Sequence, residues 1–518
     1  MKSKSKVMSK EQAVALIKNG DTIAVGGFVG CAHPEEITAE IEKSFLSKQL
    51  PRDLTLIYAA GQGDGKDKGL NHLGYEGLLK RIIGGHWNLT PKLQKLAMEN
   101  KVEAYNLPQG TISQMYRDIA AGKPGTLTHV GLKTFVDPRI EGAKLNKLTT
   151  ENIISLINID DKEYLIYKTF PINVTILKAT YADEDGYATM EKEALTLDAT
   201  AMAQAAKNSG GIVILQVEKI VAKGSLDPRK VKIPGIYVDA VVVGSPENNM
   251  QTFGEAFNPA YSGDARVPVD SIEPLEINER KVIARRCAME LVPDAATNLG
   301  IGMPEGIAIV ASEEGIGDKM TLTVEPGGIG GVPAGGLNFG ATTNPLCIMD
   351  QATQFDFYDG GGLDVAFLGL AQCDKVGNIN VSKFGPKIAG CGGFINITQN
   401  SKKVIYCGTF TTGGLKLKID EGKLIILSEG KVDKFVNKVE QITFSGEYAS
   451  NIGQPVLYVT ERAVFRLSKY GLVLIEIAPG VDLENDVLAH MEFKPIISPD
   501  LKLMDESIFK AEPMGLKI

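Results

Sequence analysis

D-T-I-A-V-G-G-F, residues 21–28, has the composition of a short β-strand that ends in two glycines. Apolar residues at helical spacing precede it at residues 10–17, and a helix with a proline near its first turn is expected at residues 33–41. A second strand-like run, L-T-L-I-Y-A-A-G-Q-G at residues 54–63, again ends in glycines. Strands that alternate with helices and end in glycine turns indicate an α/β protein whose strand-to-helix turns carry function.

The same order of elements occurs again in the second half of the chain. A helix-like run at residues 280–291 precedes A-T-N-L-G-I-G at residues 296–302, and the strand-like run M-T-L-T-V-E-P-G-G follows at residues 320–328. Further along, V-A-F-L-G-L-A-Q-C-D-K-V-G at residues 365–377 parallels V-T-I-L-K-A-T-Y-A-D-E-D-G at residues 174–186. A repeat of this length predicts two duplicated open α/β domains of similar topology.

The boundaries of the two domains follow from the repeat. Residues 258–276 are polar, contain prolines and show no hydrophobic periodicity, which is typical of a linker. We therefore expect an N-terminal domain at residues 1–255, a linker at residues 256–278 and a C-terminal domain at residues 279–518.

The composition limits the classes of partner. The chain has 518 residues, of which 44% are apolar and 23% are charged, and its net charge is 55 − 63 = −8. No basic block is interleaved with aromatic residues, so a nucleic-acid partner is not expected. No apolar run reaches the ~18 residues that a membrane span needs, so no membrane partner is expected either.

The cysteines and the first residues bear on the cellular compartment. Six cysteines lie scattered without C-x-x-C spacing, which predicts reduced thiols. The first ten residues are basic, but no apolar segment follows them, so we expect no signal peptide. These features predict a cytoplasmic protein.

Common phosphate, metal and hydrolase motifs are missing from the sequence. No glycine-rich run continues into Gly-Lys-Ser/Thr or forms G-x-G-x-x-G with an acidic residue about twenty positions on. The five histidines lack the spacing of metal ligands, and no G-x-S-x-G is present, so neither a metal site nor a serine hydrolase is predicted. His86 and Trp87 are interpreted as packing residues at the end of a helix-like stretch.

Glu325 stands out when the two halves are compared. It lies between a strand-like run and glycines, and in the other half the equivalent position is Ala59. A structural residue is expected in both copies, whereas a functional residue needs to occur only once. A carboxylate at the carboxyl end of a strand in an open α/β sheet also lies where ligands bind. We therefore expect Glu325 to be functional rather than an exposed loop carboxylate.

Several ordered blocks over nearly the whole chain resemble the family I coenzyme A transferases, which include the succinyl-CoA:3-ketoacid, acetate and propionate CoA-transferases. Residues 23–35 resemble the family's G-G-F-x-x-x-G-x-P signature, with Ala32 in place of a glycine, and N-L-G-I-G-M-P at residues 298–304 opens the second half as in the family. G-C-G-G at residues 390–393 matches as well. T-V-E-P-G-G at residues 323–328 has its Glu where many members have S-E-N-G, which favours the propionate/acetate branch.

The resemblance implies a fold and a mechanism. The fold is that of the CoA-transferases, with the active site between the two halves. Glu325 is expected to attack an acyl-CoA and to pass through an acyl-glutamyl anhydride and a glutamyl-CoA thioester, with ping-pong kinetics. The resemblance implies that a Gln side chain and a Gly backbone N–H stabilise the oxyanions. Gln109 in P-Q-G-T matches the former, and Gly392 is our choice for the latter ahead of Gly393.

The resemblance also implies contacts with CoA, which is a substrate, so no cofactor and no metal is expected. We assign these contacts to five glycines and to one of the lysines nearby, Lys383, Lys387 and Lys416: the full set is Gly302, Gly327, Gly328, Gly390, Gly393 and Lys383.

The resulting hypothesis is a transferase that moves CoA between short-chain acyl groups and acetate or propionate. Two alternatives stay open: an acyl-CoA hydrolase that uses the same Glu325, and a non-enzymatic pair of CoA- or nucleotide-sensing domains. The resemblance implies a homo-oligomer, either a tetramer or a dimer.

Overall fold

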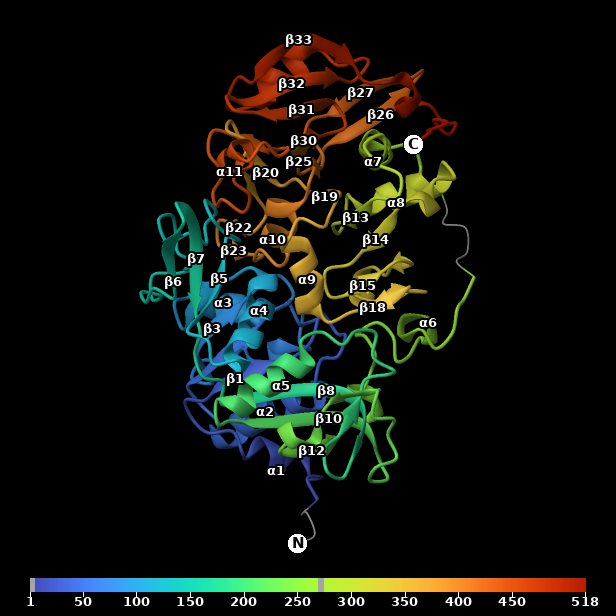
Figure 1. Ribbon diagram of the computed structural model, residues 1–518. Helices are drawn as coiled ribbons and strands as arrows, with labels where there is room; N and C mark the ends of the chain where they lie inside the picture. Colours follow the sequence, from blue (N-terminus) through green and yellow to red (C-terminus); the bar gives the residue numbers. More distant parts are fainter. Residues whose placement is uncertain (1–4, 269–273) are drawn as a thin grey trace. The chain divides into compact units, whose positions relative to one another are not determined.

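The computed structural model describes residues 5–268 and 274–518 (Figure 1). The chain divides into two compact units. Unit 1 comprises Met1–Val267, Val324–Asp356 and Pro386–Asn396, and unit 2 comprises Pro268–Thr323, Phe357–Gly385 and Ile397–Ile518. The units are defined by packing, whereas the predicted halves are defined by the repeat in the sequence. The boundaries at residues 255 and 279 therefore stay a prediction, and residues 269–273 of the predicted linker lie outside the described residues.

Unit 1 is built on a parallel sheet with the strand order β12-β10-β8-β1-β2-β3-β4. Its central strands are buried on both faces, because helices connect successive strands, and their residues are accordingly Ile, Val and Leu. The strands are β1 (Thr22–Val25), β2 (Leu54–Tyr58), β3 (Leu79–Gly84), β4 (Glu103–Asn106), β8 (Val174–Asp183), β10 (Ile212–Val221) and β12 (Ala240–Val243).

Helices and a small second sheet complete unit 1. The α-helices within residues 5–267 are α1 (Lys10–Val14), α2 (Glu35–Lys48), α3 (Pro91–Met98), α4 (Gln109–Ala120), α5 (Ala199–Asn208) and α6 (Pro259–Ser262), which lies in the predicted linker. An antiparallel sheet of the order β5-β7-β6 is formed by β5 (Gly125–Thr128), β6 (Ile154–Ile159) and β7 (Lys162–Lys168). Short antiparallel pairs include β15 (Gly328–Ile329) with β18 (Cys347–Ile348).

Unit 2 has a sheet in which β14, β13, β19, β24 and β30 are consecutive neighbours, followed by β31, β32 and β33. These strands are β13 (Ala296–Leu299), β14 (Thr321–Thr323), β19 (Val365–Gly369), β24 (Val404–Cys407), β30 (Val456–Val459), β31 (Ala463–Ser468), β32 (Gly471–Ile477) and β33 (Ile496–Leu503). Its helices include α7 (Glu279–Ala288), α8 (Glu305–Glu313) and α11 (Gly446–Asn451). A hairpin, β26 (Lys416–Asp420) with β27 (Lys423–Ser428), packs against the core of unit 2 through Leu417, Ile419 and Leu424.

The strand pairings confirm the duplicated α/β fold. In unit 1 the chain passes from β1 to β2 on one side and returns to β8 on the other side of β1. In unit 2 it passes in the same way from β13 to β14 and back to β19. The registers correspond residue by residue: Ile23 pairs with Leu56 and Val174, and Thr297 pairs with Leu322 and Val365. Counting three residues on from Leu56 and Leu322 gives Ala59 and Glu325, so the predicted equivalence of these two positions is confirmed.

One expectation about local structure is wrong. The stretch before His86 and Trp87 is the strand β3, not a helix. The apolar residues of this strand, Leu79, Ile82 and Ile83, are three and four positions apart, a spacing that also fits one face of a helix, so the pattern did not distinguish strand from helix. The packing role predicted for Trp87 is confirmed, since its side chain is fully buried in the core of unit 1.

Candidate active site

Glu325 lies in a tight turn after β14. The N–H of Gly327 donates to the carbonyl oxygen of Val324 over 3.0 Å, and the N–H of Val324 donates to Gly328 over 2.8 Å. Gly327 has φ +126°, and a side chain there would overlap the carbonyl oxygen of Met349. The turn therefore requires glycine at this position for its backbone, independently of any ligand.

The carboxyl group of Glu325 is partly buried and has no hydrogen-bond or ion-pair partner among the described residues. Burial raises its pKa to about 7, because the charged form has lost water without gaining a donor. A Cβ on Gly393 would overlap the Oε2 atom of Glu325, so the carboxyl group lies directly against this glycine. A carboxylate in these surroundings is poorly solvated, which suits a nucleophile.

The loop that carries Gly393 is anchored to the strand ends of the N-terminal sheet. The N–H of Trp87 donates to the carbonyl oxygen of Ala389 over 2.8 Å. The N–H of Cys391 donates to the side chain of Asn106 over 2.9 Å. The loop leads into α10 (Phe394–Asn400), so its position is set by bonds to residues about 285 positions earlier in the chain.

The two candidate oxyanion donors in this loop differ in availability. The N–H of Gly392 donates to the carbonyl oxygen of Gly85 over 2.8 Å, so this hydrogen is already used. In the part of the chain that the structure describes, the N–H of Gly393 has no acceptor. Gly393 also lies against Glu325, as described above. The geometry therefore favours Gly393 over Gly392, the reverse of the order expected from the sequence.

Gln109 is the first residue of α4 and is buried. Its backbone N–H donates to the carbonyl oxygen of Gly392 over 2.9 Å, which joins the start of the helix to the glycine loop. Its side-chain Nε2 donates to Oε1 of Gln351 over 3.1 Å. The structure thus brings together Glu325, Gln109, Gly392 and Gly393, which come from both predicted halves of the sequence and all belong to unit 1.

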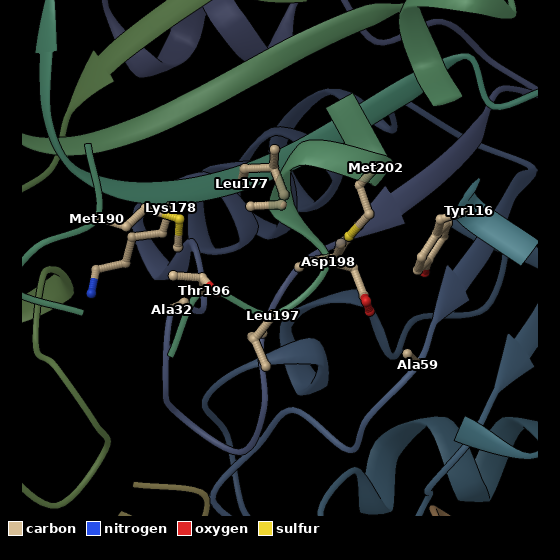
Figure 2. A pocket seen from close by; sticks show the side chains of 14 residues that line it. Ala32, Ala59, Tyr116, Leu177, Lys178, Met190, Thr196, Leu197, Asp198 and Met202 are labelled. Carbon is tan, nitrogen blue, oxygen red and sulfur yellow. The ribbon is translucent and has the colours of Figure 1, made fainter. Parts of the chain in front are cut away.

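A pocket lies at the carboxyl end of β1, beside Leu177 and Lys178 in the middle of β8, in unit 1 (Figure 2). These two strands flank the point where the strand order reverses, which is the usual ligand position in open α/β sheets. Its lining is mostly apolar, but it includes Asp198 and Tyr116, two buried residues. Among the described residues, Asp198 Oδ1 and Tyr116 Oη have no hydrogen-bond partner. Burial raises the pKa of Asp198 to about 7.

Gln351, Asp198 and Ser113 were not expected in this region from the sequence, and His86 was expected only as a packing residue. Gln351, the first residue of α9 (Gln351–Asp359), contacts Gln109, and Asp198 and Ser113 contact Gln351. His86 lies beside the glycine loop, and burial lowers the pKa of its imidazole to about 4, so it is neutral at pH 7. No short motif marks these residues, because only the folded chain brings them together.

The residues predicted to contact CoA lie in different settings. Gly390 has φ +79°, and a side chain there would meet Trp87, while a Cβ on Gly328 would meet Thr342 Oγ1 at 2.7 Å. Gly302, with φ +83°, has open space around it in the turn before α8. Lys383 lies in β22 (Lys383–Phe384) and is partly exposed. The first two glycines therefore have a structural reason that is independent of CoA.

The described residues contain neither a membrane-spanning helix nor a cluster of metal ligands. No helix within residues 5–268 and 274–518 is long and apolar enough to cross a membrane. Those same residues contain no group of three His, Cys, Asp or Glu side chains that could hold a metal ion.

Comparison with known proteins gives this geometry a family. The model of the family described as coenzyme A transferase matches residues 7–244. The acetate CoA-transferase YdiF of Escherichia coli K12 is 46% identical over 510 residues, which cover 98% of this chain and 96% of the relative. The chain belongs to the coenzyme A transferase family.

Two further relatives extend the comparison for this CoA-transferase. The caffeate CoA-transferase of Acetobacterium woodii is also 46% identical, over 518 residues that cover 99% of both chains. A crystal structure of the acyl-CoA transferase YdiF from E. coli O157:H7, described as a thioester complex with CoA, matches with a TM-score of 0.94 and 45% identity, covering 99% of this chain and 98% of that one. The fold and the family expected from the sequence are thus confirmed.

Proposed function

We propose that this CoA-transferase moves CoA between a short-chain acyl-CoA and a free carboxylate such as acetate or propionate, with Glu325 as the temporary acceptor. The observation that carries the proposal is the carboxyl group of Glu325, which lies against Gly393 without any hydrogen-bond partner among the described residues and has a pKa raised to about 7. The similarity to a protein whose structure is described as a CoA thioester complex supports the same chemistry.

The proposed reaction has two halves with balanced bond changes. The Glu325 carboxylate attacks the thioester carbonyl, the C–S bond breaks, and CoA leaves as a thiolate from an acyl-glutamyl anhydride. The thiolate then attacks the glutamyl carbonyl, which releases the first acid as a carboxylate and leaves a glutamyl-CoA thioester. A second carboxylate reverses these steps and leaves as the new acyl-CoA. No net proton is consumed, and the kinetics are ping-pong.

Each attack places negative charge on a carbonyl oxygen, which needs donors close by. We propose the side-chain amide of Gln109 and the backbone N–H of Gly393 for this role. The latter replaces Gly392, our choice from the sequence, because the Gly392 N–H already donates to Gly85. Gly392 retains a supporting role, since its carbonyl oxygen accepts the backbone N–H of Gln109.

The contacts with CoA are proposed at two kinds of position. Gly393 lies at the carboxyl group that would hold the thioester, and Gly302 lies in an open turn where a ligand could approach the backbone. Lys383 stays the proposed basic contact. The close packing around Gly327, Gly328 and Gly390 accounts for the glycine at each of these positions without a contact to CoA.

The acyl group is the least constrained part of the proposal. The acetate and caffeate CoA-transferases are equally similar to this chain, at 46% identity, although their names state very different acids. We keep acetate and propionate, because the resemblance of T-V-E-P-G-G favours that branch. A difference of one methylene is worth only about 1–3 kcal/mol of specificity, so related short acids should also react.

Initial rates with acetyl-CoA and a panel of acceptor acids test this proposal. We expect propionate and other short acids to give the new acyl-CoA with parallel-line kinetics, and we expect caffeate to react poorly. Glu325→Gln should abolish transfer. Release of CoA at the same rate with and without an acceptor would instead support the hydrolase, and intersecting lines would contradict the covalent mechanism.

The location and the assembly are also proposals. We keep the cytoplasm and a homo-oligomer, either a tetramer or a dimer, as the predictions made from the sequence. Light scattering coupled to size-exclusion chromatography would distinguish these assemblies from a monomer.

A further inference from the structure

A chain of hydrogen bonds runs from the proposed oxyanion donor into the interior of unit 1. Nε2 of Gln109 donates to Oε1 of Gln351 over 3.1 Å. Nε2 of Gln351 donates to Oγ of Ser113 over 2.7 Å and to Oδ2 of Asp198 over 2.8 Å. Oγ of Ser113 donates in turn to Oδ2 of Asp198 over 3.0 Å. We call these three residues, Gln351, Ser113 and Asp198, the amide relay.

The donors and acceptors of the amide relay permit only one orientation of Gln351. Asp198 Oδ2 takes the hydrogen of Ser113, and when Asp198 holds a proton, Oδ1 can carry it because no described residue bonds that oxygen, so Oδ2 accepts in both forms. Both partners of the Gln351 NH₂ group can therefore only accept, and a flipped amide would direct its carbonyl oxygen at them. The relative exposure of all four side chains is 5% or less, so water does not replace a lost partner at low cost.

The orientation of Gln351 determines the orientation of Gln109. Since Oε1 of Gln351 must point toward Gln109, the Gln109 side chain must present its NH₂ group and not its oxygen. One hydrogen of that group binds Gln351, and the other has no acceptor among the described residues. This second hydrogen is the one available to an oxyanion. If the amide of Gln109 were flipped, an oxygen would take the place of the donor.

The backbone holds the amide relay independently of these side chains. The N–H of Gln351 donates to the carbonyl oxygen of Leu197 over 3.1 Å. Next to it, Oγ1 of Thr196 donates to Oδ1 of Asp350 over 2.8 Å. The segments that carry Gln351 and Asp198 are thus fixed side by side, so a change of one side chain in the relay can be made without detaching the segments.

We infer that Gln351, Ser113 and Asp198 are positioning residues of the transfer reaction, which fix the amide of Gln109 with an N–H directed at the oxyanion. The inference rests on the proposed function, because it requires an oxyanion that forms when Glu325 attacks the acyl-CoA. It adds a role for three residues that do not themselves contact the reacting atoms.

A double-mutant cycle on Gln109 and Gln351 tests the inference. The measurement is the single-turnover rate at which acetyl-CoA, without an acceptor acid, modifies Glu325, followed by quenching and mass spectrometry. Gln351→Met removes the acceptor while it keeps the length of the side chain, and we expect a fall of about 10-fold with little change in the acetyl-CoA concentration at half-maximal rate. Gln109→Ala should cost about 100-fold.

The cycle separates positioning from a general structural effect. If Gln351 acts through Gln109, then Gln351→Met should cost less than 2-fold once Gln109 is already Ala. A merely structural role of Gln351 would give the same fall of about 10-fold in both backgrounds. Equal falls, or no fall in the wild-type background, would overturn the inference.

An exchange of partners gives a second test that does not depend on truncation. In Asp198→Asn/Gln351→Glu, the Asn NH₂ can donate to one Glu oxygen while the other Glu oxygen accepts from Gln109, so the pattern seen by Gln109 is restored. We expect the rate to return to within about 3-fold of wild type. A double variant as slow as Gln351→Met would count against the inference.

Asp137→Asn is the matched control, since Asp137 is also a fully buried Asp of unit 1 that accepts hydrogen bonds, from the N–H of Lys133 and from Nε of Arg139. We expect it to lower thermal stability and to leave the modification rate within 2-fold. The wild-type reaction separates the two levels of the account. Failure of wild type to be modified at Glu325 would overturn both the proposed function and the inference. Modification of wild type together with equal falls in the cycle would overturn the inference alone.

Discussion

The pKa of Glu325 links its burial to the stability of the protein. Burial raises this pKa to about 7, whereas the unfolded chain has the ordinary value near 4.5. The native state therefore holds a proton that the unfolded state releases between about pH 4.5 and pH 7. Stability from this group is present below pH 4.5 and is lost as the pH rises through 7.

Glu325→Gln removes this dependence, because the amide does not titrate. We expect the variant to be more stable than wild type at pH 8, by an amount on the order of 1–3 kcal/mol, and the difference to vanish near pH 4.5. Urea denaturation of both proteins between pH 4.5 and pH 8.5 measures it. A difference that does not change with pH would show that Glu325 has an ordinary pKa.

At the scale of single residues, motifs were sufficient to select Glu325 and Gln109 as candidates, and their roles stay predictions. Glu325 occurs in only one of the two repeats, and Gln109 lies in P-Q-G-T. The choice between Gly392 and Gly393 could not be made from G-C-G-G, because it depends on a bond to Gly85, about 300 residues earlier. Gln351 has no motif at all, since its contacts to Ser113 and Asp198 arise only in the folded chain.

The glycine loop at residues 390–393 is an element whose positions have separate tasks. It is held by Gly85, Asn106 and Trp87, and it presents its last residue to Glu325. A Cβ on Gly393 would overlap Glu325, whereas a Cβ on Gly392 would be 3.7 Å from its nearest neighbour, His86. The cost at Gly392 comes instead from its φ of +52°.

Alanine substitutions should separate these tasks. Gly393→Ala should lower kcat/KM for acetyl-CoA by 100-fold or more, because it displaces the carboxyl group of Glu325 by an ångström or so. Gly392→Ala should cost about 1 kcal/mol of stability through its positive φ, with a fall in kcat/KM of less than about 10-fold. Steady-state kinetics and thermal unfolding of both variants test this, and the opposite order of the two kinetic effects would restore Gly392 as the oxyanion donor.

At the scale of elements, strand ends were easier to predict than the nature of short apolar runs. The strands at residues 54–58 and 296–299 were expected because glycines follow them. The stretch that forms β3 was interpreted as helical, because its apolar residues Leu79, Ile82 and Ile83 have the three- and four-residue spacing of a helix face.

At the scale of the whole molecule, the sequence repeat and the packing divide the chain differently. The repeat gave the topology of both sheets, because equivalent strands keep equivalent registers. It could not show that residues 324–356 and 386–396 pack with the first 267 residues, since this depends on contacts between segments far apart in sequence.

This packing predicts the behaviour of a divided chain. Residues 1–267 alone lack Glu325 and the glycine loop, and the partners of these segments on β3, β4 and α4 would be exposed. We expect residues 1–267 to be poorly folded by themselves and to copurify with residues 268–518 when the two are coexpressed, with transfer activity restored. The intact chain with the same tag is the control. A piece of residues 1–267 as stable as the intact chain would contradict this packing.

The central claim is that CoA is held on Glu325 during the reaction, and the mass of that residue after reaction tests it most directly. The protein is incubated with acetyl-CoA in the absence of an acceptor acid, reduced with borohydride and mapped by peptide mass spectrometry. We predict that Glu325 is reduced to the corresponding alcohol in wild type, and that the peptide is unchanged in Glu325→Gln. Modification at any other residue, or an unmodified Glu325 in a protein that transfers CoA, would contradict the account.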